Sequence, residues 1–210
     1  MIAVIDYGVG NLFSLTASLK YLGADVKVSL FVSLTARGKE AADRIILPGV
    51  GAFADAKEKL DQTGLVETIL EQTADGKPLL GICLGMQLLF DESHEYGVHK
   101  GLGLIKGKIA SIDEDLKKAG IAGLKVPHIG WNSLQFEKDE PLFRYNKPGD
   151  YVYYVHSFYG TDCEESIIAT SEYGVTITGA VRSGKVYGTQ FHPEKSGEAG
   201  LKMLKAFMEV

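Results

Sequence analysis

Leu79-Leu80-Gly81-Ile82-Cys83-Leu84-Gly85 is the stretch from which the fold of this chain is best inferred. The apolar run at its start is typical of a strand buried on both faces, as in a parallel sheet, and a helical pattern begins at Leu84. Residues 81–85 read G-x-C-x-G between strand and helix, which is the thiol form of a nucleophile elbow. Because ligands bind at the carboxyl ends of strands in open α/β sheets, the stretch predicts such a sheet with Cys83 presented at its edge.

The segments that precede this stretch alternate between short apolar runs and helical patterns. Runs bounded by Gly, Pro and charges suit buried parallel strands, and leucines at helical spacing suit helices that cover a sheet. The predicted strands are 2–5 and 45–47, and the predicted helices are 12–22, ended by Gly23, and about 55–73. The polar stretch 35–42 is predicted to connect two elements and not to separate domains.

The second half of the chain has a different character. From about residue 101 to residue 182 it is rich in Tyr, Phe, Val, Ile and Gly, with frequent turn signals. Strands are predicted at 151–155, 166–170 and 186–191, and a closing helix carries Leu201, Leu204, Phe207 and Met208. The sequence therefore predicts an α/β fold with an open, mostly parallel central sheet flanked by helices and an added antiparallel part. Without a repeat or a linker, 210 residues are expected to form a single domain, 1–210.

The charge balance is mildly acidic, with 22 Lys and Arg against 27 Asp and Glu and a net charge of −5. Nucleic acids and anionic membranes require a basic face, so neither is expected as the main partner. Met1 leads directly into the apolar run without a basic start or a cleavage site, and no apolar run approaches the roughly 18 residues needed to span a bilayer. We therefore expect a cytoplasmic protein.

Two cysteines, Cys83 and Cys163, differ in their surroundings. A secreted domain held by disulfides usually carries more than two, although one bridge between them stays possible. Cys83 is expected at a helix N-terminus, whose partial positive charge favours the thiolate, and a buried core position is the alternative for it. Acidic neighbours disfavour a thiolate at Cys163, for which we expect a structural role.

His192 is the best candidate for a general base among five histidines. It ends an apolar strand in Gly188-Thr189-Gln190-Phe191-His192-Pro193-Glu194, and Pro193 favours an extended backbone at the residue before it. Residues i and i+2 of an extended segment point to the same side, so Glu194 can lie beside the imidazole and fix its tautomer. Cys83, His192 and Glu194 would then form an acyl-transfer triad. His156 is the rival base, but it lacks a carboxylate at i+2 and is expected behind the site or facing a partner.

Pro48-Gly49-Val50-Gly51 follows the predicted strand 45–47 and should reach the sheet edge near Cys83. Glycines let a backbone N–H turn toward a developing oxyanion, and one such donor contributes about 3 kcal/mol. Val50 and Gly51 are therefore candidates for an oxyanion hole, with the Leu84 N–H as the second donor. An ordinary turn explains the same four residues as well.

These motifs together resemble those of the class I (triad) glutamine amidotransferases, over essentially the whole chain. The nucleophile motif 81–87 and the histidine motif 188–196 are shared across that family and are very specific to it. The start 5–11, together with 130–132 and 156–159, resembles those members that supply ammonia to a (β/α)8-barrel cyclase in histidine biosynthesis.

The resemblance implies a role for each matching residue. Cys83 would be the nucleophile, His192 the base and Glu194 its orienter, and no cofactor or metal is expected. Contacts to L-glutamine are implied for Gln87, Glu95, Ser157 and Phe158, and contacts to the barrel cyclase subunit for Asn11, Trp131 and Lys195. Phe13 stands where relatives often carry a basic residue, which leaves the local partner contacts open.

Three alternatives differ from this interpretation. Another triad glutaminase, the pyridoxal 5'-phosphate synthase subunit, has a similar length but carries a Gly-Gly-Glu-Ser oxyanion segment. A catalytically dead scaffold is disfavoured because all three triad residues are present. A hydrolase acting alone, like a cysteine peptidase of related fold, is disfavoured by Gln87 and Glu95, which suit a free amino acid.

Overall fold

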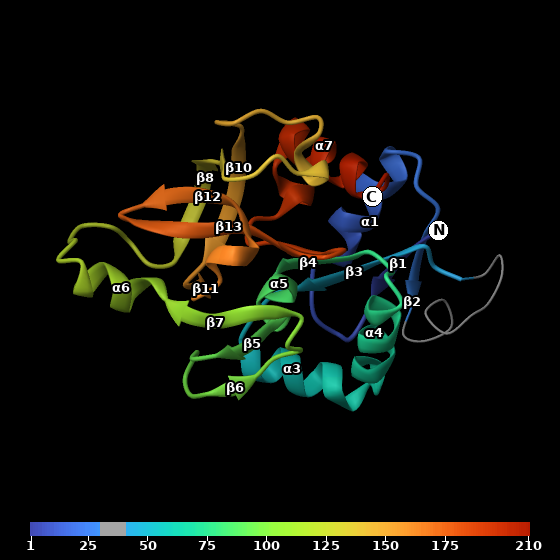
Figure 1. The fold of residues 1–210 in the computed structure, drawn as a ribbon, viewed down its shortest axis with the longest axis horizontal. Coiled ribbons are helices and arrows are strands. Elements are labelled where there is room, and N and C mark those ends of the chain that lie inside the picture. The colour runs from blue at the N-terminus through green and yellow to red at the C-terminus, as the bar shows by residue number, and fades with distance from the viewer. Residues whose placement is uncertain (30–40) are drawn as a thin grey trace.

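A computed structural model describes residues 1–29 and 41–210, and these contain an eight-stranded sheet in the order β2-β1-β3-β4-β14-β13-β12-β9 (Figure 1). The first five strands in that order run parallel to one another, and β13, β12 and β9 continue the sheet in antiparallel fashion. The bounds are β1 Ile2–Ile5, β2 Val26–Ser29, β3 Arg44–Gly49, β4 Leu79–Cys83, β9 Gln135–Phe136, β12 Ile167–Tyr173, β13 Val175–Ser183 and β14 Val186–Thr189. The predicted mostly parallel sheet with an added antiparallel part is confirmed.

Two smaller sheets in the described ranges lie beside the large one. An antiparallel pair joins β8 and β10, and a four-stranded sheet has the order β11-β7-β5-β6. Their bounds are β5 Phe90–Ser93, β6 His99–Lys100, β7 Ile105–Ser111, β8 His128–Ser133, β10 Tyr151–His156 and β11 Phe158–Thr161. The β-rich second half therefore supplies the antiparallel end of the large sheet, the β8–β10 pair and two strands of the four-stranded sheet, whose other two strands, β5 and β6, precede it.

Helices cover both faces of the parallel strands, as Figure 1 shows, with α1 and α7 on one side and α3, α4 and α5 on the other. The helices are α1 Leu12–Tyr21, α3 Phe53–Gln62, α4 Leu65–Ala74, α5 Leu84–Leu88, α6 Ile112–Lys118 and α7 Gly197–Phe207. Short 3₁₀ turns are η2 Pro141–Phe143, η3 Glu164–Ser166 and η4 Pro193–Lys195.

Alternation along the strands decides which helix each side chain meets. In β1, Val4 packs in the cluster of α1 and α7, whereas the neighbouring Ala3 packs in the cluster of α3 and α4. Leu15 and Leu19, four residues apart on α1, are both completely buried. Each such leucine stabilises the fold by about 1.5–3 kcal/mol relative to an exposed one, so the helices are held mainly by these apolar stripes.

One sequence prediction of helix length was wrong. The pattern 55–73 is not one helix: α3 ends at Gln62 and α4 begins at Leu65, because Gly64 adopts the left-handed conformation with φ of 70°. The helix that starts at Leu84 has only five residues before the chain enters β5. Most of the predicted connection 35–42 lies outside the described residues.

The carboxyl ends of the central strands meet at one edge of the sheet. The register pairs Gly49 of β3 with Cys83 of β4, and Thr189 of β14 with Ile82. Three segments that are far apart in the sequence therefore end side by side, and this edge is where the candidate site forms.

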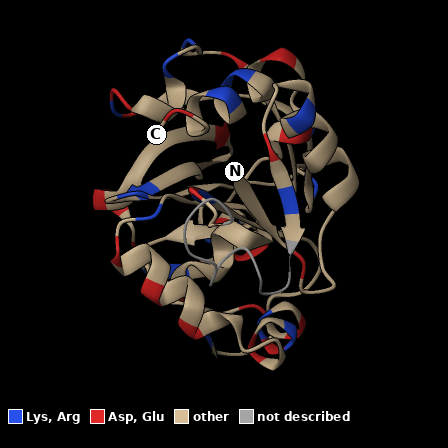
Figure 2. Ribbon diagram, turned by 90° about the vertical axis from the view of Figure 1, so that its right-hand side faces the viewer, with Lys and Arg blue, Asp and Glu red and all other residues tan. Residues whose placement is uncertain are grey.

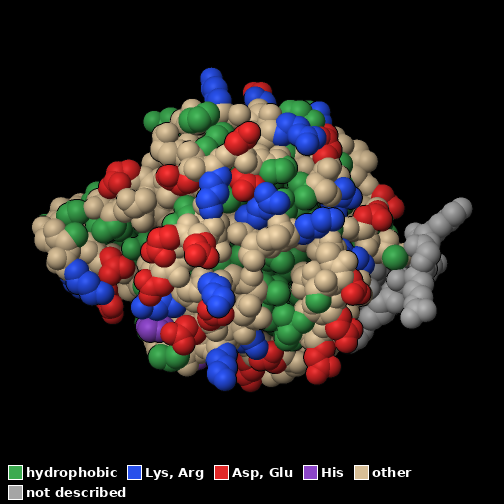
Figure 3. Space-filling view, viewed as in Figure 1, with side chains coloured by type: hydrophobic (Ala, Val, Ile, Leu, Met, Phe, Trp, Pro, Cys, Tyr) green, Lys and Arg blue, Asp and Glu red, His purple; other side chains and the backbone are tan. Residues whose placement is uncertain are grey.

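Charged side chains lie mostly on the outside of the fold. Figure 2 shows few of them on the strands at the centre, and Figure 3 shows Lys and Arg interspersed with Asp and Glu on one face. None of the helices in the described ranges is long and apolar enough to cross a membrane.

Candidate active site

Cys83 sits at a strained turn between β4 and α5, with φ of 54° and ψ of −111°. A non-glycine residue held in such a region costs about 1–3 kcal/mol and persists only where packing enforces it. That packing comes from glycines. A Cβ atom on Gly85 would lie 1.8 Å from the Leu47 carbonyl oxygen, and one on Gly81 would lie 2.7 Å from the Gly85 carbonyl oxygen. The glycines of the elbow therefore permit close backbone contact, while Cys83 itself takes the unusual conformation.

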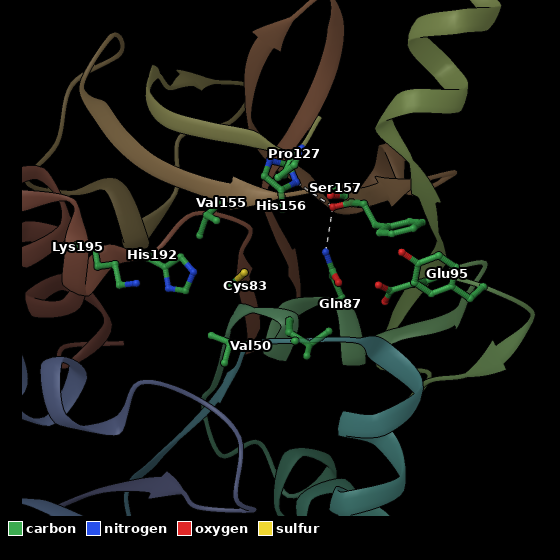
Figure 4. A pocket seen from close by; sticks show the side chains of 14 residues that line it. Val50, Cys83, Gln87, Glu95, Pro127, Val155, His156, Ser157, His192 and Lys195 are labelled. Carbon is green, nitrogen blue, oxygen red and sulfur yellow. Dashed lines mark hydrogen bonds between the residues drawn. The ribbon is translucent and has the colours of Figure 1, made fainter. Parts of the chain in front are cut away.

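His192 and Glu194 lie together behind the candidate nucleophile. The ring nitrogen Nδ1 of His192 is 2.8 Å from Glu194 Oε1, and the two side chains are 2% and 4% exposed. The backbone that arranges them is extended at His192 and enters η4 at Pro193, as the i, i+2 argument requires. His192 Nε2 is buried and makes no hydrogen bond to any of the described residues. The ring faces Cys83 in Figure 4. That nitrogen is therefore available for proton transfer.

The charge on His192 depends on its neighbours. Burial lowers its pKa, but interactions with Cys83 and with Glu194 outweigh burial and raise the pKa to about 9. A protonated imidazole beside Cys83 stabilises the thiolate, which is the reactive form of the thiol.

Gln190 completes this group, although it is not among the site residues predicted from the sequence. It is fully buried, and its Nε2 group donates to Cys83 Sγ at 3.8 Å. Its side-chain oxygen accepts from Gln87 Nε2 at 3.0 Å, and the same Gln87 nitrogen donates to the Phe158 carbonyl oxygen at 3.0 Å. Gln190 lies two residues before His192 in the extended segment, so side-chain alternation was the signal that could have found it.

A cavity of about 420 Å³ opens above Cys83, a size typical of small-molecule sites. Figure 4 shows Cys83 between His192 and Lys195 on one side and Gln87 and Glu95 on the other. The predicted site residues that line the cavity are Val50, Gly51, Cys83, Leu84, Gln87, Glu95, Ser157, Phe158, His192 and Lys195, joined by the unpredicted Tyr96, Pro127 and Val155 and by the rival base His156. Glu194 lies behind His192, outside this lining.

The segment after β3 is held at both ends next to Cys83. At one end Tyr7 donates its hydroxyl hydrogen to the Pro48 carbonyl oxygen at 2.8 Å. At the other, Glu95 Oε2 accepts from the Phe53 backbone N–H at 2.7 Å, at the first residue of α3. Between these anchors Gly51 has φ of 99°, and Val50 is 41% exposed. Tyr7 was also missed, although it lies in the quoted N-terminal motif.

Glu95 combines this anchor with a place in the cavity wall. It is 9% exposed, and burial raises its pKa against the opposing effects of the Phe53 hydrogen bond and His99. One carboxylate oxygen is used by Phe53 N–H, and the other has no such bond to the backbone. A ligand ammonium group placed near Glu95 would stabilise the charged form of this largely buried carboxylate.

The rival base His156 is excluded by its hydrogen bonds. Its Nδ1 lies 2.8 Å from the Phe158 carbonyl oxygen, and its Nε2 lies 3.0 Å from His128 Nδ1. Burial, followed by repulsion from the other histidines, lowers its pKa to about 3 despite the Phe158 bond. Both nitrogens are occupied, so His156 has none left for a substrate. It is 6% exposed and forms part of the cavity wall.

The three residues expected at an interface have different settings. Asn11 caps α1, because its side-chain oxygen accepts from the Ser14 N–H at 3.3 Å. Trp131 is 55% exposed but lies on strand β8, not in the loop that its neighbours suggested. Lys195 is exposed at the rim of the cavity, and Phe13 is 84% exposed.

Cys163 is a free, buried cysteine that does not line the cavity. Its Sγ lies 3.9 Å from Thr178 Oγ1. Burial, reinforced by Glu164 and Asp162, raises the pKa of its thiol to about 11. Cys83 is also free, so the possible bridge between the two cysteines does not form.

The chain is similar in sequence to known proteins over nearly its whole length. A sequence model of the family described as "Glutamine amidotransferase class-I" matches residues 3–210. The imidazole glycerol phosphate synthase subunit HisH of Listeria monocytogenes is 46% identical over 210 residues, which cover 100% of this chain and 96% of that protein. The subunit HisH of Bacillus licheniformis is 49% identical over the same lengths.

Solved structures share the fold at much lower identity. The structure of PurLQS from Thermotoga maritima matches with a TM-score of 0.73 and 20% identity, over 99% of this chain and 97% of that one. A crystal structure described as a glutamine amidotransferase matches with a TM-score of 0.71 and 19% identity, over 100% and 98%.

Proposed function

The chain belongs to the class-I glutamine amidotransferase family, and on this premise we propose that it is the glutaminase subunit of an imidazole glycerol phosphate synthase. Identities of 46% and 49% to HisH subunits along the whole chain support this activity. The observation in the site that carries it is the buried line from Cys83 through His192 to Glu194 at the floor of a small cavity. The reaction is hydrolysis of L-glutamine to glutamate and ammonia, which we assign to the cytoplasm.

The first half of the reaction forms a thioester. The Cys83 thiolate attacks the carboxamide carbon, and a tetrahedral intermediate with a negatively charged oxygen results. N–H groups of Val50 or Gly51 and of Leu84 are the proposed donors to that oxygen, and each would contribute about 3 kcal/mol. His192 then gives its proton to the departing nitrogen, so that the C–N bond breaks and ammonia leaves.

The second half restores the enzyme. Neutral His192 accepts a proton from a water molecule, which attacks the thioester carbon. The C–S bond breaks, glutamate leaves, and the Cys83 thiolate and the imidazolium are regenerated together. Glu194 keeps the imidazole in the required tautomer through both halves, because its Oε1 is bonded to Nδ1.

The other cavity residues suit the remaining parts of glutamine. The Glu95 carboxylate oxygen that is not bonded to the Phe53 N–H can accept a hydrogen bond from the α-ammonium group. Gln87 and the backbone of Ser157 and Phe158 line the same side of the cavity. Ammonium binding at Glu95 and the position of the oxyanion segment are linked, since the same carboxylate holds the Phe53 N–H.

For the partner we propose a (β/α)8-barrel cyclase that receives the ammonia and uses PRFAR to make imidazole glycerol phosphate and AICAR. The relatives are named as subunits of a synthase, which supports a partner of some kind. Exposed apolar side chains on the cavity wall and on strand β8 support a docking surface: Val50, Ile129 and Trp131 are 41%, 59% and 55% exposed. Lys195 adds a cation at the same rim.

Ammonia release from glutamine tests the proposal. It is measured for the chain alone and for the chain with a barrel cyclase and its nucleotide ligand, in the unchanged protein, in Cys83→Ala and in the matched control Cys163→Ala. We expect slow release alone, faster release in the complex, and loss of both only in Cys83→Ala. Release that survives in Cys83→Ala would refute the proposed nucleophile, and full activity without the partner would favour a hydrolase that acts alone.

A further inference from the structure

Two buried histidines outside the proposed triad connect strand β8 to the backbone of the candidate site. His128 begins β8 and pairs with His156, which ends β10. His128 Nδ1 lies 3.0 Å from His156 Nε2, and His156 Nδ1 lies 2.8 Å from the Phe158 carbonyl oxygen. The two residues are 3% and 6% exposed, so the hydrogen bond between their rings is shielded from water.

The position of each proton on these rings follows from their partners. The Phe158 carbonyl oxygen can only accept, so His156 carries its proton on Nδ1 and its Nε2 must accept. His128 therefore donates from Nδ1 and accepts at Nε2.

The hydrogen bond on the other side of His128, to Asn132, gives the same assignment of protons. The Asn132 side-chain oxygen accepts from the Ser133 N–H at 2.8 Å, which turns its NH₂ group toward His128 Nε2 at 3.4 Å. Every donor thus points in one direction, from Asn132 toward Phe158. Burial supports this neutral arrangement, because it lowers the pKa of His128 to about 4 and that of His156 to about 3.

The series of hydrogen bonds continues from the Phe158 carbonyl oxygen to the proposed nucleophile, Cys83. That oxygen also accepts from Gln87, whose NH₂ group donates in addition to the Gln190 side-chain oxygen. Gln190 in turn donates to Cys83 Sγ. The dashed lines in Figure 4 show the two bonds that meet at the Phe158 carbonyl oxygen.

We propose that His128 is a positioning residue for glutamine hydrolysis, which acts through His156 to hold the Phe158 backbone at the substrate site. The inference rests on the proposed function. His128 touches neither the cavity nor Cys83, so its effect is exerted through geometry: the Phe158 carbonyl oxygen needs both of its donors to keep the adjoining peptide in place. The outer face of the same strand carries Ile129 and Trp131, so the strand that bears the proposed partner contacts also bears this residue.

A packing role for His128 must be separated from this hydrogen-bonding role. Its ring stacks on Tyr173 and Tyr154, with centroids 4.0 Å and 4.7 Å away. His128→Phe keeps an aromatic ring for stacking and removes the donor to His156. His128→Asn removes the ring but keeps an N–H at the position of Nδ1. His128→Phe therefore keeps only the packing role, and His128→Asn keeps only the hydrogen-bonding role.

Steady-state glutamine hydrolysis by the complex with the barrel subunit separates them. We expect His128→Phe to raise KM for glutamine by about tenfold with kcat changed much less, because a displaced Phe158 backbone weakens substrate binding before the chemical step. His128→Asn should restore KM to within about threefold of the unchanged protein. An unchanged KM in His128→Phe, or a KM equally raised in both variants, would overturn the inference.

A measurement on the unchanged protein does not depend on how the variants fold. Nitrogen-15 correlation spectra of the histidine rings should show the proton on Nδ1 in both His128 and His156 at pH 7. A proton on Nε2 of His128 would overturn the inference. Failure of the proposed function is recognised separately, since the unchanged complex would then release no ammonia from glutamine.

Discussion

Gly85 and Leu47 are in such close contact that a Cβ atom on Gly85 would lie 1.8 Å from the Leu47 carbonyl oxygen. This contact brings α5 directly against β3, and it sets the segment after β3 beside the turn at Cys83. The candidate nucleophile and the candidate oxyanion donors are therefore placed by a single backbone approach that only glycine allows.

Gly85→Ala should strongly destabilise the fold, because either β3 or α5 must move to admit the methyl group. Overpacking of this kind typically costs about 1–3 kcal/mol and more where the backbone itself is in the way. Gly76→Ala is the matched control, since Gly76 has φ of 82° but open space around it and should lose only about 1–2 kcal/mol. Urea unfolding of both variants measures the difference, and equal losses would show that the contact with Leu47 yields easily.

His192 should titrate with a pKa near 9, and the value should fall in Cys83→Ala and in Glu194→Gln. Both partners raise it against the opposing effect of burial, so removal of either leaves burial with less opposition. A histidine-resolved NMR titration measures this, with Cys163→Ala as the control that leaves it unchanged. In activity, His192→Ala should be as damaging as Cys83→Ala, and Glu194→Gln milder. A His156→Ala variant more damaging than His192→Ala would reverse the assignment of the base.

Stability should decrease as the pH falls below about 6.5. His128 and His156 have pKa values lowered by burial to about 4 and 3, whereas in the unfolded chain they titrate near 6.5. Between these values the unfolded chain binds protons that the folded protein does not, so the free energy of unfolding falls by up to about 1.4 kcal/mol per pH unit for each extra proton. Above pH 6.5 neither histidine contributes to this slope.

Urea unfolding at pH 7, 6 and 5 measures that slope in the unchanged protein and in His128→Asn, where one histidine is gone and the slope should be smaller. His94→Asn, at an exposed histidine, is the control. Equal slopes in all three proteins would contradict burial as the source of the acid sensitivity.

Trp131→Ala should leave the isolated chain folded and weaken the complex with the barrel subunit by at least about tenfold. The side chain is 55% exposed and makes an edge contact with Tyr153. Truncation of a tryptophan at an interface often costs about 2 kcal/mol or more of binding free energy. Tyr21→Ala is the matched control: Tyr21 is 79% exposed and ends α1, away from the cavity. Calorimetric titration and thermal melting measure the two effects. A fall of many degrees in Tm with unchanged affinity would show that Trp131 serves the fold instead.

Sequence patterns were sufficient wherever the structure depends on neighbours in the chain. The apolar runs became β1, β3 and β4, and the pairing of His192 with Glu194 followed from an extended backbone that points residues i and i+2 to one side. The strand-to-helix turn at Cys83 was readable for the same reason. Such features repeat with the local geometry of the backbone, so a few residues determine them.

Tertiary structure decided everything that depends on which segments become neighbours. Gln190 meets Cys83 across 107 positions of sequence separation, and His128 meets His156 only because β8 and β10 pair in one register. The break at Gly64, by contrast, is a local feature that the helical pattern concealed, because this glycine adopts the left-handed conformation. Strand order and register result from the sum of many weak contacts made at once, and no short stretch contains that sum. The sequence by itself therefore determined the candidate triad, and only the fold decided which buried side chains surround it.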